Sequence, residues 1–130
     1  MEQQPLQASF QPPEPALLGQ LRFNDAGLIP AIAQDWLDGA VLMVAWMNRD
    51  ALESTLASGD VHYWSRSRAE LWHKGASSGH FQKLRGLRYD CDADVLLLTI
   101  EQVGEVACHT GARSCFFGED PGATGGPGAL

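Results

Sequence analysis

Three cysteines, Cys91, Cys108 and Cys115, are the residues of this chain whose type most suggests metal chemistry. Thiolate sulfur is a preferred zinc ligand, and three protein ligands plus a water molecule form a typical catalytic zinc site. One loop can bring Cys108 and Cys115 to a single ion, whereas Cys91 must come from a different segment. No CxxC pair is present, so three buried, unreactive thiols are an equally simple interpretation of the spacing.

A run of alternating aspartates surrounds the first of these cysteines, as Asp90-Cys91-Asp92-Ala93-Asp94. If this stretch is extended, the three carboxylates project to one face and Cys91 to the other. Carboxylates on one face repel each other unless a cation neutralises them, and Mg²⁺ prefers oxygen ligands. The run therefore predicts a magnesium site opposite a zinc ligand, with a solvent-exposed polar strand end as the alternative.

The basic residues are concentrated, since six of the nine lie between Arg66 and Lys74 or between Lys83 and Arg88. Guanidinium groups, hydroxyls and the backbone N–H groups of a glycine-containing loop all suit phosphate oxygens. The pattern predicts phosphate binding, with a solvated basic loop as the alternative. The candidate residues are Arg66, Arg68, Lys74, Ser77 and Ser78.

His109 is the histidine that adjoins a candidate metal ligand, Cys108. It could be a further ligand, a proton carrier or a surface residue. The other three histidines are better interpreted as structural. Trp64 and Trp72 flank the basic stretch, and packing residues or the walls of a purine pocket are both consistent with their positions.

A mostly β fold is needed to bring these residues together. Asn48 is a suitable N-cap and Gly59 a suitable stop, which predicts one clear helix of roughly ten residues between them. Asp38-Gly39 indicates a hairpin. Apolar and alternating stretches predict strands over 28–34, 41–47, 61–65, 71–74, 81–92 (with a kink at Gly86), 95–103 and 115–117.

The chain length of 130 residues suits one domain. Residues 1–17 are rich in proline and glutamine and predict a flexible arm, and residues 119–130 predict a disordered Gly/Pro tail. The folded domain is then expected over residues 18–118.

The formal net charge of −7 and the pI near 4.8 argue against nucleic acid or a membrane surface as a partner. An odd number of cysteines excludes complete internal disulfide pairing. Neither a signal peptide nor an apolar run of about 20 residues is present. These features predict a cytoplasmic protein with reduced thiols.

Four motifs taken together resemble the phosphoribosyl-AMP cyclohydrolase family of histidine biosynthesis. They run in order along the chain as Trp64-Ser65-Arg66-Ser67-Arg68, Leu71-Trp72-His73-Lys74-Gly75 with Ser77-Ser78-Gly79, Asp90-Cys91-Asp92-Ala93-Asp94, and Cys108-His109-Thr110-Gly111 with Ser114-Cys115-Phe116. The resemblance covers residues from about 27 to 117. Ser77 stands where the family more often has threonine, which keeps a hydroxyl.

The resemblance implies a compact, strand-dominated α+β fold with a barrel-like mixed sheet, in a homodimer. It implies zinc bound by Cys91, Cys108 and Cys115 and shared between chains, and magnesium at Asp90, Asp92 and Asp94. The implied reaction is opening of the adenine ring at N1–C6 by zinc-activated water, and we expect His109 to carry a proton.

Other functions fit less of this pattern. The phosphoribosyl-ATP pyrophosphohydrolase that is fused to some members is expected to be absent here. A zinc-dependent nucleoside or nucleobase deaminase would call for H-x-E and P-C-x-x-C motifs, which the sequence lacks. A non-catalytic, zinc-stabilised binding module would need a fourth protein ligand, which only His109 offers.

Overall fold

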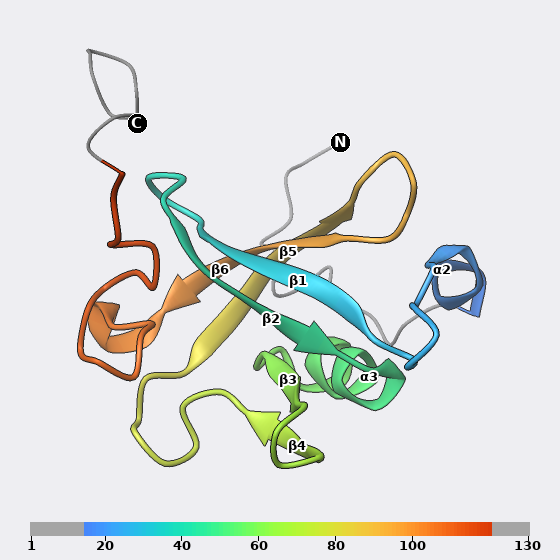
Figure 1. Cartoon of the computed structure of the whole chain (residues 1–130), viewed down its shortest axis with the longest axis horizontal. Helices are drawn as coiled ribbons and strands as arrows, with labels where there is room; N and C mark the ends of the chain where they lie inside the picture. Colours follow the sequence, from blue (N-terminus) through green and yellow to red (C-terminus); the bar gives the residue numbers. More distant parts are fainter. Residues whose placement is uncertain (1–14, 121–130) are drawn as a thin grey trace, which may run out of the picture.

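Six strands form one mixed sheet in the computed structural model, which describes residues 15–120 (Figure 1). The strand order is β4-β3-β2-β1-β6-β5, and β1 pairs with β6 in parallel while the other neighbours are antiparallel. The sheet curls into a half-barrel, as the resemblance implied. The strands are β1 (Ile29–Asp35), β2 (Val41–Met47), β3 (His62–Ser65), β4 (Glu70–His73), β5 (Gln82–Tyr89) and β6 (Leu96–Gln102).

The predicted helix is confirmed as α3 (Arg49–Ser58). The Asn48 side chain accepts a hydrogen bond from the backbone N–H of Ala51, and Gly59 adopts a left-handed conformation at the other end. These are the capping interactions that the residue types favour. The helix packs against β3, and its buried residues are Ala51, Leu52 and Thr55.

Two short helical segments were not predicted. Helix α2 (Pro15–Gln20) begins inside the stretch expected to be a flexible arm, and the 3₁₀ segment η1 (Val103–Glu105) follows β6 directly. The rest of the predicted arm, residues 1–14, and residues 121–130 of the predicted tail lie outside the described residues. None of the helices in the described part of the chain is long and apolar enough to cross a membrane.

The core lies on the concave side of the sheet, where alternate residues of β1 and β6 are fully buried. It also contains a polar chain. The Tyr63 hydroxyl donates to Gln82 Oε1 (2.6 Å), and the Gln82 amide donates to Gln102 Oε1 (2.9 Å). Gln102 in turn donates to the backbone carbonyl of His80. Buried polar groups need such partners, so this chain fixes the ends of β5 and β6 relative to β3.

Two predicted strands are wrong in part or in full. The strand expected over 81–92 ends at Tyr89, and residues 90–94 form a turn in which Ala93 has a positive φ of 61°. No strand forms over residues 115–117, where Cys115 lies in a bend outside the sheet. The alternation that was expected to place the aspartates opposite Cys91 therefore does not apply.

Candidate functional site

The loop after η1 holds two of the three cysteines close together. The backbone of this loop closes on itself, because Cys108 N–H donates to Ala112 O and Gly111 N–H donates to Cys108 O. Cys115 is attached to the start of β2 through a hydrogen bond from its N–H to Leu42 O (2.7 Å). The thiols of Cys108 and Cys115 lie close enough to hydrogen bond with each other, and their role as ligands of one ion stays a prediction.

Neighbouring groups tune these two thiols in opposite directions. Thr110 Oγ1 donates to the Cys108 sulfur (3.0 Å), and this hydrogen bond lowers the pKa of the Cys108 thiol. Burial, followed by the adjacent Cys108, raises the pKa of the Cys115 thiol. Thr110 was missed at the sequence level, although a hydroxyl two residues after a candidate thiolate is a usable signal for such a donor.

A cavity of about 710 Å³ opens beside this loop and brings most of the predicted site together. Cys108 and His109 line one side of it. Four of the five predicted phosphate-binding residues line the rest, namely Arg68, Lys74, Ser77 and Ser78. Residues more than thirty positions apart in sequence thus share one hollow. Its lining supplies cations, hydroxyls, a thiol and three imidazoles, those of His73, His80 and His109.

Arg66 lies outside this cavity. Its guanidinium stacks over the Trp46 ring at 4.9 Å, in a second cavity of about 450 Å³ that Trp64 also lines. Arg68 and Trp72 line both cavities, so the two hollows are neighbours at the β3–β4 turn. Trp64 and Trp72 both line this second, tryptophan-lined cavity, and the purine-pocket interpretation of these two residues stays a prediction.

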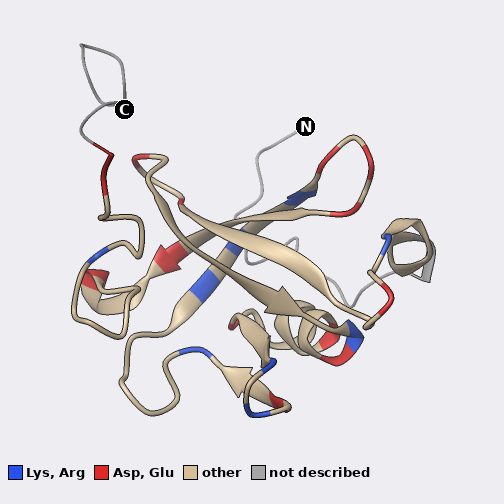
Figure 2. Cartoon of the chain, viewed as in Figure 1, with Lys and Arg blue, Asp and Glu red and all other residues tan. Residues whose placement is uncertain are grey.

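Cys91 and the three aspartates lie at the opposite end of the sheet. Strand β6 separates the β5–β6 turn from η1 and the Cys108 loop, and its seven residues span about 20 Å. Figure 2 shows the acidic β5–β6 turn far from the basic residues of the β3–β4 turn. Within residues 15–120 of one chain, no three His, Cys, Asp or Glu side chains are grouped so that they could hold a metal ion.

The aspartate turn has its own hydrogen bonds. Asp90 Oδ1 accepts from the backbone N–H groups of Asp94 (2.9 Å) and Val95 (3.2 Å). Desolvation opposes ionisation of Asp90, but these bonds and the Asp94 side chain lower its pKa overall. The hydrogen bond with Asp90 raises the pKa of Asp94, and the charges of Asp90 and Asp92 add to this effect. The three carboxylates are exposed in one turn, but they are not grouped so that all three could hold one ion, and the magnesium site expected there stays a prediction.

The small-residue loop after β4 depends on Gly75. This glycine has φ +93°, and a side chain there would collide with the backbone of His80 and Phe81. Gly79 has φ +82°, but none of the described atoms lies within 4 Å of the place that a Cβ would occupy there. Both glycines therefore adopt a conformation that disfavours other residues, but only Gly75 is also enclosed.

Replacing Gly75 by alanine is expected to destabilise the fold by about 3 kcal/mol or more, because backbone strain and a collision with backbone combine. Gly79→Ala is the matched control, with an expected cost of about 1–2 kcal/mol from strain alone. Urea denaturation followed by circular dichroism would measure both. Equal losses in the two variants would contradict the enclosed position of Gly75.

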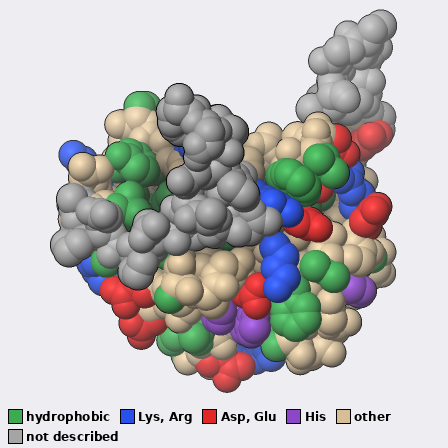
Figure 3. Space-filling view, turned by 180° about the vertical axis from the view of Figure 1, so that it is seen from behind, with side chains coloured by type: hydrophobic (Ala, Val, Ile, Leu, Met, Phe, Trp, Pro, Cys, Tyr) green, Lys and Arg blue, Asp and Glu red, His purple; other side chains and the backbone are tan. Residues whose placement is uncertain are grey.

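Two other histidines, His62 and His73, form a stacked pair, and His73 also lines the cavity. The rings of His62 and His73 stack at 4.3 Å, and Asp60 lies 3.4 Å from His73 Nε2 and 2.8 Å from Lys83 Nζ. Figure 3 shows histidine side chains in contact with each other on this face, with acidic and basic side chains beside them. His73 and His80 both line the cavity beside Cys108, so the structural role expected of these histidines stays a prediction.

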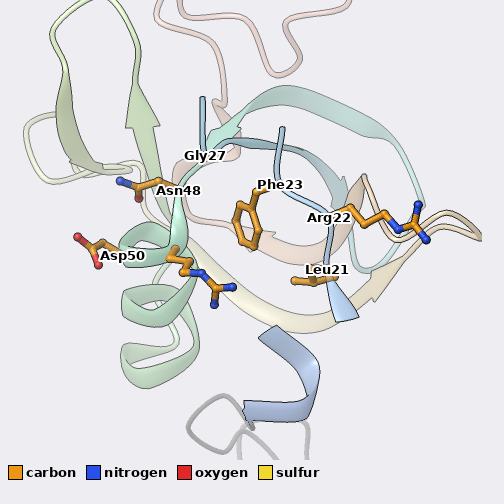
Figure 4. Close-up of a pocket in the computed structure, with 7 residues that line it drawn as sticks. Leu21, Arg22, Phe23, Gly27, Asn48 and Asp50 are labelled. Carbon is orange, nitrogen blue, oxygen red and sulfur yellow. The ribbon is translucent and has the colours of Figure 1, made fainter. Parts of the chain in front are cut away.

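A hollow near α2 offers less chemistry than the main cavity. It encloses about 720 Å³ between residues 21–27 and the start of α3, and Figure 4 shows the Phe23 ring at its centre with the Arg22 guanidinium turned away. Arg49 stacks over Phe23 at 5.2 Å. Among the described residues that line this hollow, none carries a thiol, an imidazole or a hydroxyl, so the cavity beside Cys108 is the better candidate for a reaction site.

Comparison with known proteins adds a family to this geometry. Residues 43–117 match the sequence profile described as phosphoribosyl-AMP cyclohydrolase, and this range contains every predicted site residue. A protein named phosphoribosyl-AMP cyclohydrolase from Trichormus variabilis is 63% identical over 102 residues, which cover 78% of this chain and 88% of that protein. The chain belongs to the phosphoribosyl-AMP cyclohydrolase family.

Members of the phosphoribosyl-AMP cyclohydrolase family also occur as parts of longer proteins. The histidine biosynthesis bifunctional protein HisIE of Parasynechococcus marenigrum (strain WH8102) is 74% identical over 122 residues, which cover 93% of this chain and 55% of that protein. The protein of the same name from Prochlorococcus marinus (strain MIT 9313) is 77% identical over 110 residues, covering 85% and 50%. The chain thus spans about half the length of these relatives, and the expected absence of a pyrophosphohydrolase stays a prediction.

Proposed function

We propose that this protein hydrolyses the N1–C6 bond of the adenine ring in 1-(5-phosphoribosyl)-AMP, a step of histidine biosynthesis. The observation that carries the proposal is the single cavity lined by Cys108, His109, Arg68, Ser77 and Ser78. In one hollow it combines a candidate ligand for a soft metal, a candidate proton carrier and side chains that can donate hydrogen bonds to phosphate oxygens. Family membership supports the same reaction.

Zinc is the metal that fits the donor set best. Cys108 and Cys115 lie together and are unpaired, and Thr110 donates to the Cys108 sulfur, which favours its thiolate form. When bound, zinc would lower the pKa of a water molecule from its bulk value to about 7, which would make hydroxide available near neutral pH. A reducing compartment such as the cytoplasm would keep these thiols free.

The third sulfur is proposed to come from a second copy of the chain. Cys91 is exposed at the far end of β6, about 20 Å from the Cys108 loop, so one chain cannot unite all three. In a two-fold dimer each chain would give Cys91 to one site and Cys108 with Cys115 to the other. The site would then be incomplete in a monomer.

An apolar row on the convex face of the sheet could form part of the dimer contact. Strand register places Pro30 beside Trp46, Trp46 beside Trp64, and Trp64 beside Leu71. Leu71 is 43% exposed, and Val44 on the same face is 49% exposed. Exposed apolar side chains favour burial against another protein surface, and the incomplete zinc set points to a second copy. Because Trp46 and Trp64 also line the tryptophan-lined cavity, the second copy would lie beside that cavity.

The residues of the two neighbouring cavities have different roles in this proposal. Arg68, Ser77 and Ser78 would bind the oxygens of one phosphate. Arg66, in the neighbouring tryptophan-lined cavity, would bind the phosphate of the second phosphoribosyl group. His109 would take a proton from the attacking water and deliver one to N1 as the bond to C6 breaks. Magnesium at Asp90, Asp92 and Asp94 would neutralise the negative charge of the β5–β6 turn and help to orient Cys91 in the same turn.

Replacing His109 by alanine is expected to lower kcat by about 10²–10⁴-fold while leaving metal content unchanged, because a proton carrier is lost and no ligand is removed. Steady-state kinetics and metal analysis of the same preparation would measure this. His62→Ala is the control, since His62 does not line the cavity. An unchanged kcat in the His109 variant would remove it from the mechanism.

The proposed activity is tested by incubation of the protein with phosphoribosyl-AMP while purine absorbance is followed. We expect turnover that a chelator abolishes and added zinc restores. Absence of ring opening with metal supplied would overturn the proposal. Turnover of adenosine or cytidine in its place would favour a deaminase. Loss of the fold after chelation, with His109 bound to the metal, would favour the non-catalytic zinc module.

A further inference from the structure

Lys74 is a buried lysine at the end of β4. Only 8% of its surface is exposed, and its backbone N–H donates to Val61 O, which fixes the chain at this point. Its ammonium donates a hydrogen bond of 2.6 Å to the carbonyl of Ala107 and lies 5.3 Å from the centre of the Trp72 ring. A buried charge is costly without partners, so these contacts must be specific.

The ammonium contacts the peptide unit that leads into a thiol. Ala107 directly precedes Cys108, and Lys74 and Cys108 line the same cavity. The side chain therefore connects β4 to the loop that carries both sulfurs, across thirty-three positions of sequence.

We propose that Lys74 is a positioning residue for the metal site, holding the Ala107–Cys108 peptide in place and balancing the charge of the two sulfurs when they bind a metal. This inference rests on the proposed function, because it takes Cys108 and Cys115 to be ligands. On metal binding both thiols lose protons to solvent, which leaves two negative charges in a partly buried loop. A lysine ammonium fixed against the loop compensates for them.

This role differs from the phosphate binding that the sequence predicted for Lys74. A phosphate-binding lysine contributes mainly to KM, whereas a positioning residue contributes to metal affinity and to the geometry of the ligands. The hydrogen bond to Ala107 O and the low exposure of Lys74 favour the second role. Arg68, Ser77 and Ser78 are exposed and remain available to phosphate.

Cobalt(II) is a suitable probe, because its sulfur-to-metal charge-transfer absorption reports directly on thiolate ligands. The full chain, freed of metal and titrated with cobalt(II), would be compared with Lys74→Met. We expect Lys74→Met to bind cobalt about 10–100-fold more weakly and with an altered charge-transfer band, the range found when outer-shell partners of metal ligands are removed. Lys74→Arg, which keeps the charge, should recover most of the affinity.

Lys83→Met is the matched control, since Lys83 is 49% exposed in its side chain and pairs with Asp60 outside the cavity. It should bind cobalt like the unmodified protein. Should Lys74→Met fail to fold, Lys74→Gln takes its place, because glutamine can still donate to the Ala107 carbonyl but carries no charge.

The outcomes separate this inference from the function on which it rests. A Lys74→Met protein with unchanged cobalt affinity and spectrum, and a raised KM for phosphoribosyl-AMP, would overturn the positioning role and support phosphate binding. The same result for Lys74→Gln would overturn the charge balance, because glutamine keeps the hydrogen bond to Ala107. If the unmodified protein itself shows no thiolate-to-cobalt band, the metal site proposed above fails and the role of Lys74 fails with it.

Discussion

Replacing Cys108 by alanine is expected to abolish tight zinc binding and to lower kcat/KM by at least about 10³-fold, because the water nucleophile loses the metal that makes its deprotonation favourable at neutral pH. Cys108 is 6% exposed and lies in a loop closed by its own backbone hydrogen bonds, so the fold should survive the change. Metal analysis, steady-state kinetics and a thermal melt of one preparation would measure its zinc content, its kcat/KM and the stability of its fold.

Thr110→Val gives a graded comparison for this experiment. It retains all three thiols and a similar shape, but removes the hydroxyl that donates to the Cys108 sulfur at 3.0 Å. We expect it to weaken metal binding by about 10–100-fold, well short of the loss in Cys108→Ala. Full activity in Cys108→Ala, with or without bound zinc, would contradict the proposal that Cys108 binds a catalytic zinc.

Two inactive variants are expected to regain activity when their subunits are mixed. Cys91→Ser and Cys108→Ser would each lack one sulfur in every site of a homodimer. In an equal mixture after subunit exchange, half of the dimers combine one chain of each kind, and each such dimer has one intact site. Activity should therefore rise from near zero to about a quarter of that of the unmodified protein.

A second mixture controls for refolding and dilution effects. Cys108→Ser and Cys115→Ser remove sulfurs that lie in the same loop of one chain, so no combination of these subunits restores a complete site. This mixture should stay inactive. Recovery in both mixtures, or in neither, would rule out a site in which Cys91 comes from the second chain.

The parts of the fold with strong local signals could be predicted from sequence. Asn48 and Gly59 set the ends of α3 through their own side-chain and backbone preferences, without help from distant residues. The wholly apolar run 41–47 became β2, with β1 and β3 on either side. Helix α2 was missed because its proline and glycine are typical of loops, and only its position beside the core favours helix.

The aspartate run shows why alternation alone is a weak guide. The prediction took residues 90–94 to be extended, but aspartate is also a turn former, because its carboxylate accepts hydrogen bonds from the backbone a few residues ahead. Asp90 does this with Asp94 and Val95, and Ala93 adopts a positive φ to complete the turn. The residue types were informative about charge, but not about which way each side chain projects.

The cavity could be predicted in part. Arg68, Lys74, Ser77 and Ser78 were grouped by sequence proximity, and the structure adds Cys108 and His109 to them. The position of Arg66 depends on strand register, which sets Trp64 opposite Trp46 and gives the guanidinium an aromatic surface. The contact of Lys74 with Ala107 depends on how two distant segments pack, and no local pattern indicates it.

The parallel pairing of β1 with β6 has a consequence for how the chain folds during synthesis. Strand β5 is joined to the rest of the sheet mainly through β6, which lies between it and β1 and is the last of the six strands to emerge from the ribosome. Until then both β1 and β5 have an unpaired edge, and such edges promote aggregation of incomplete chains. Folding therefore depends on a late, long-range step, and truncated or stalled chains that end before Leu96 should be recovered mainly as insoluble material.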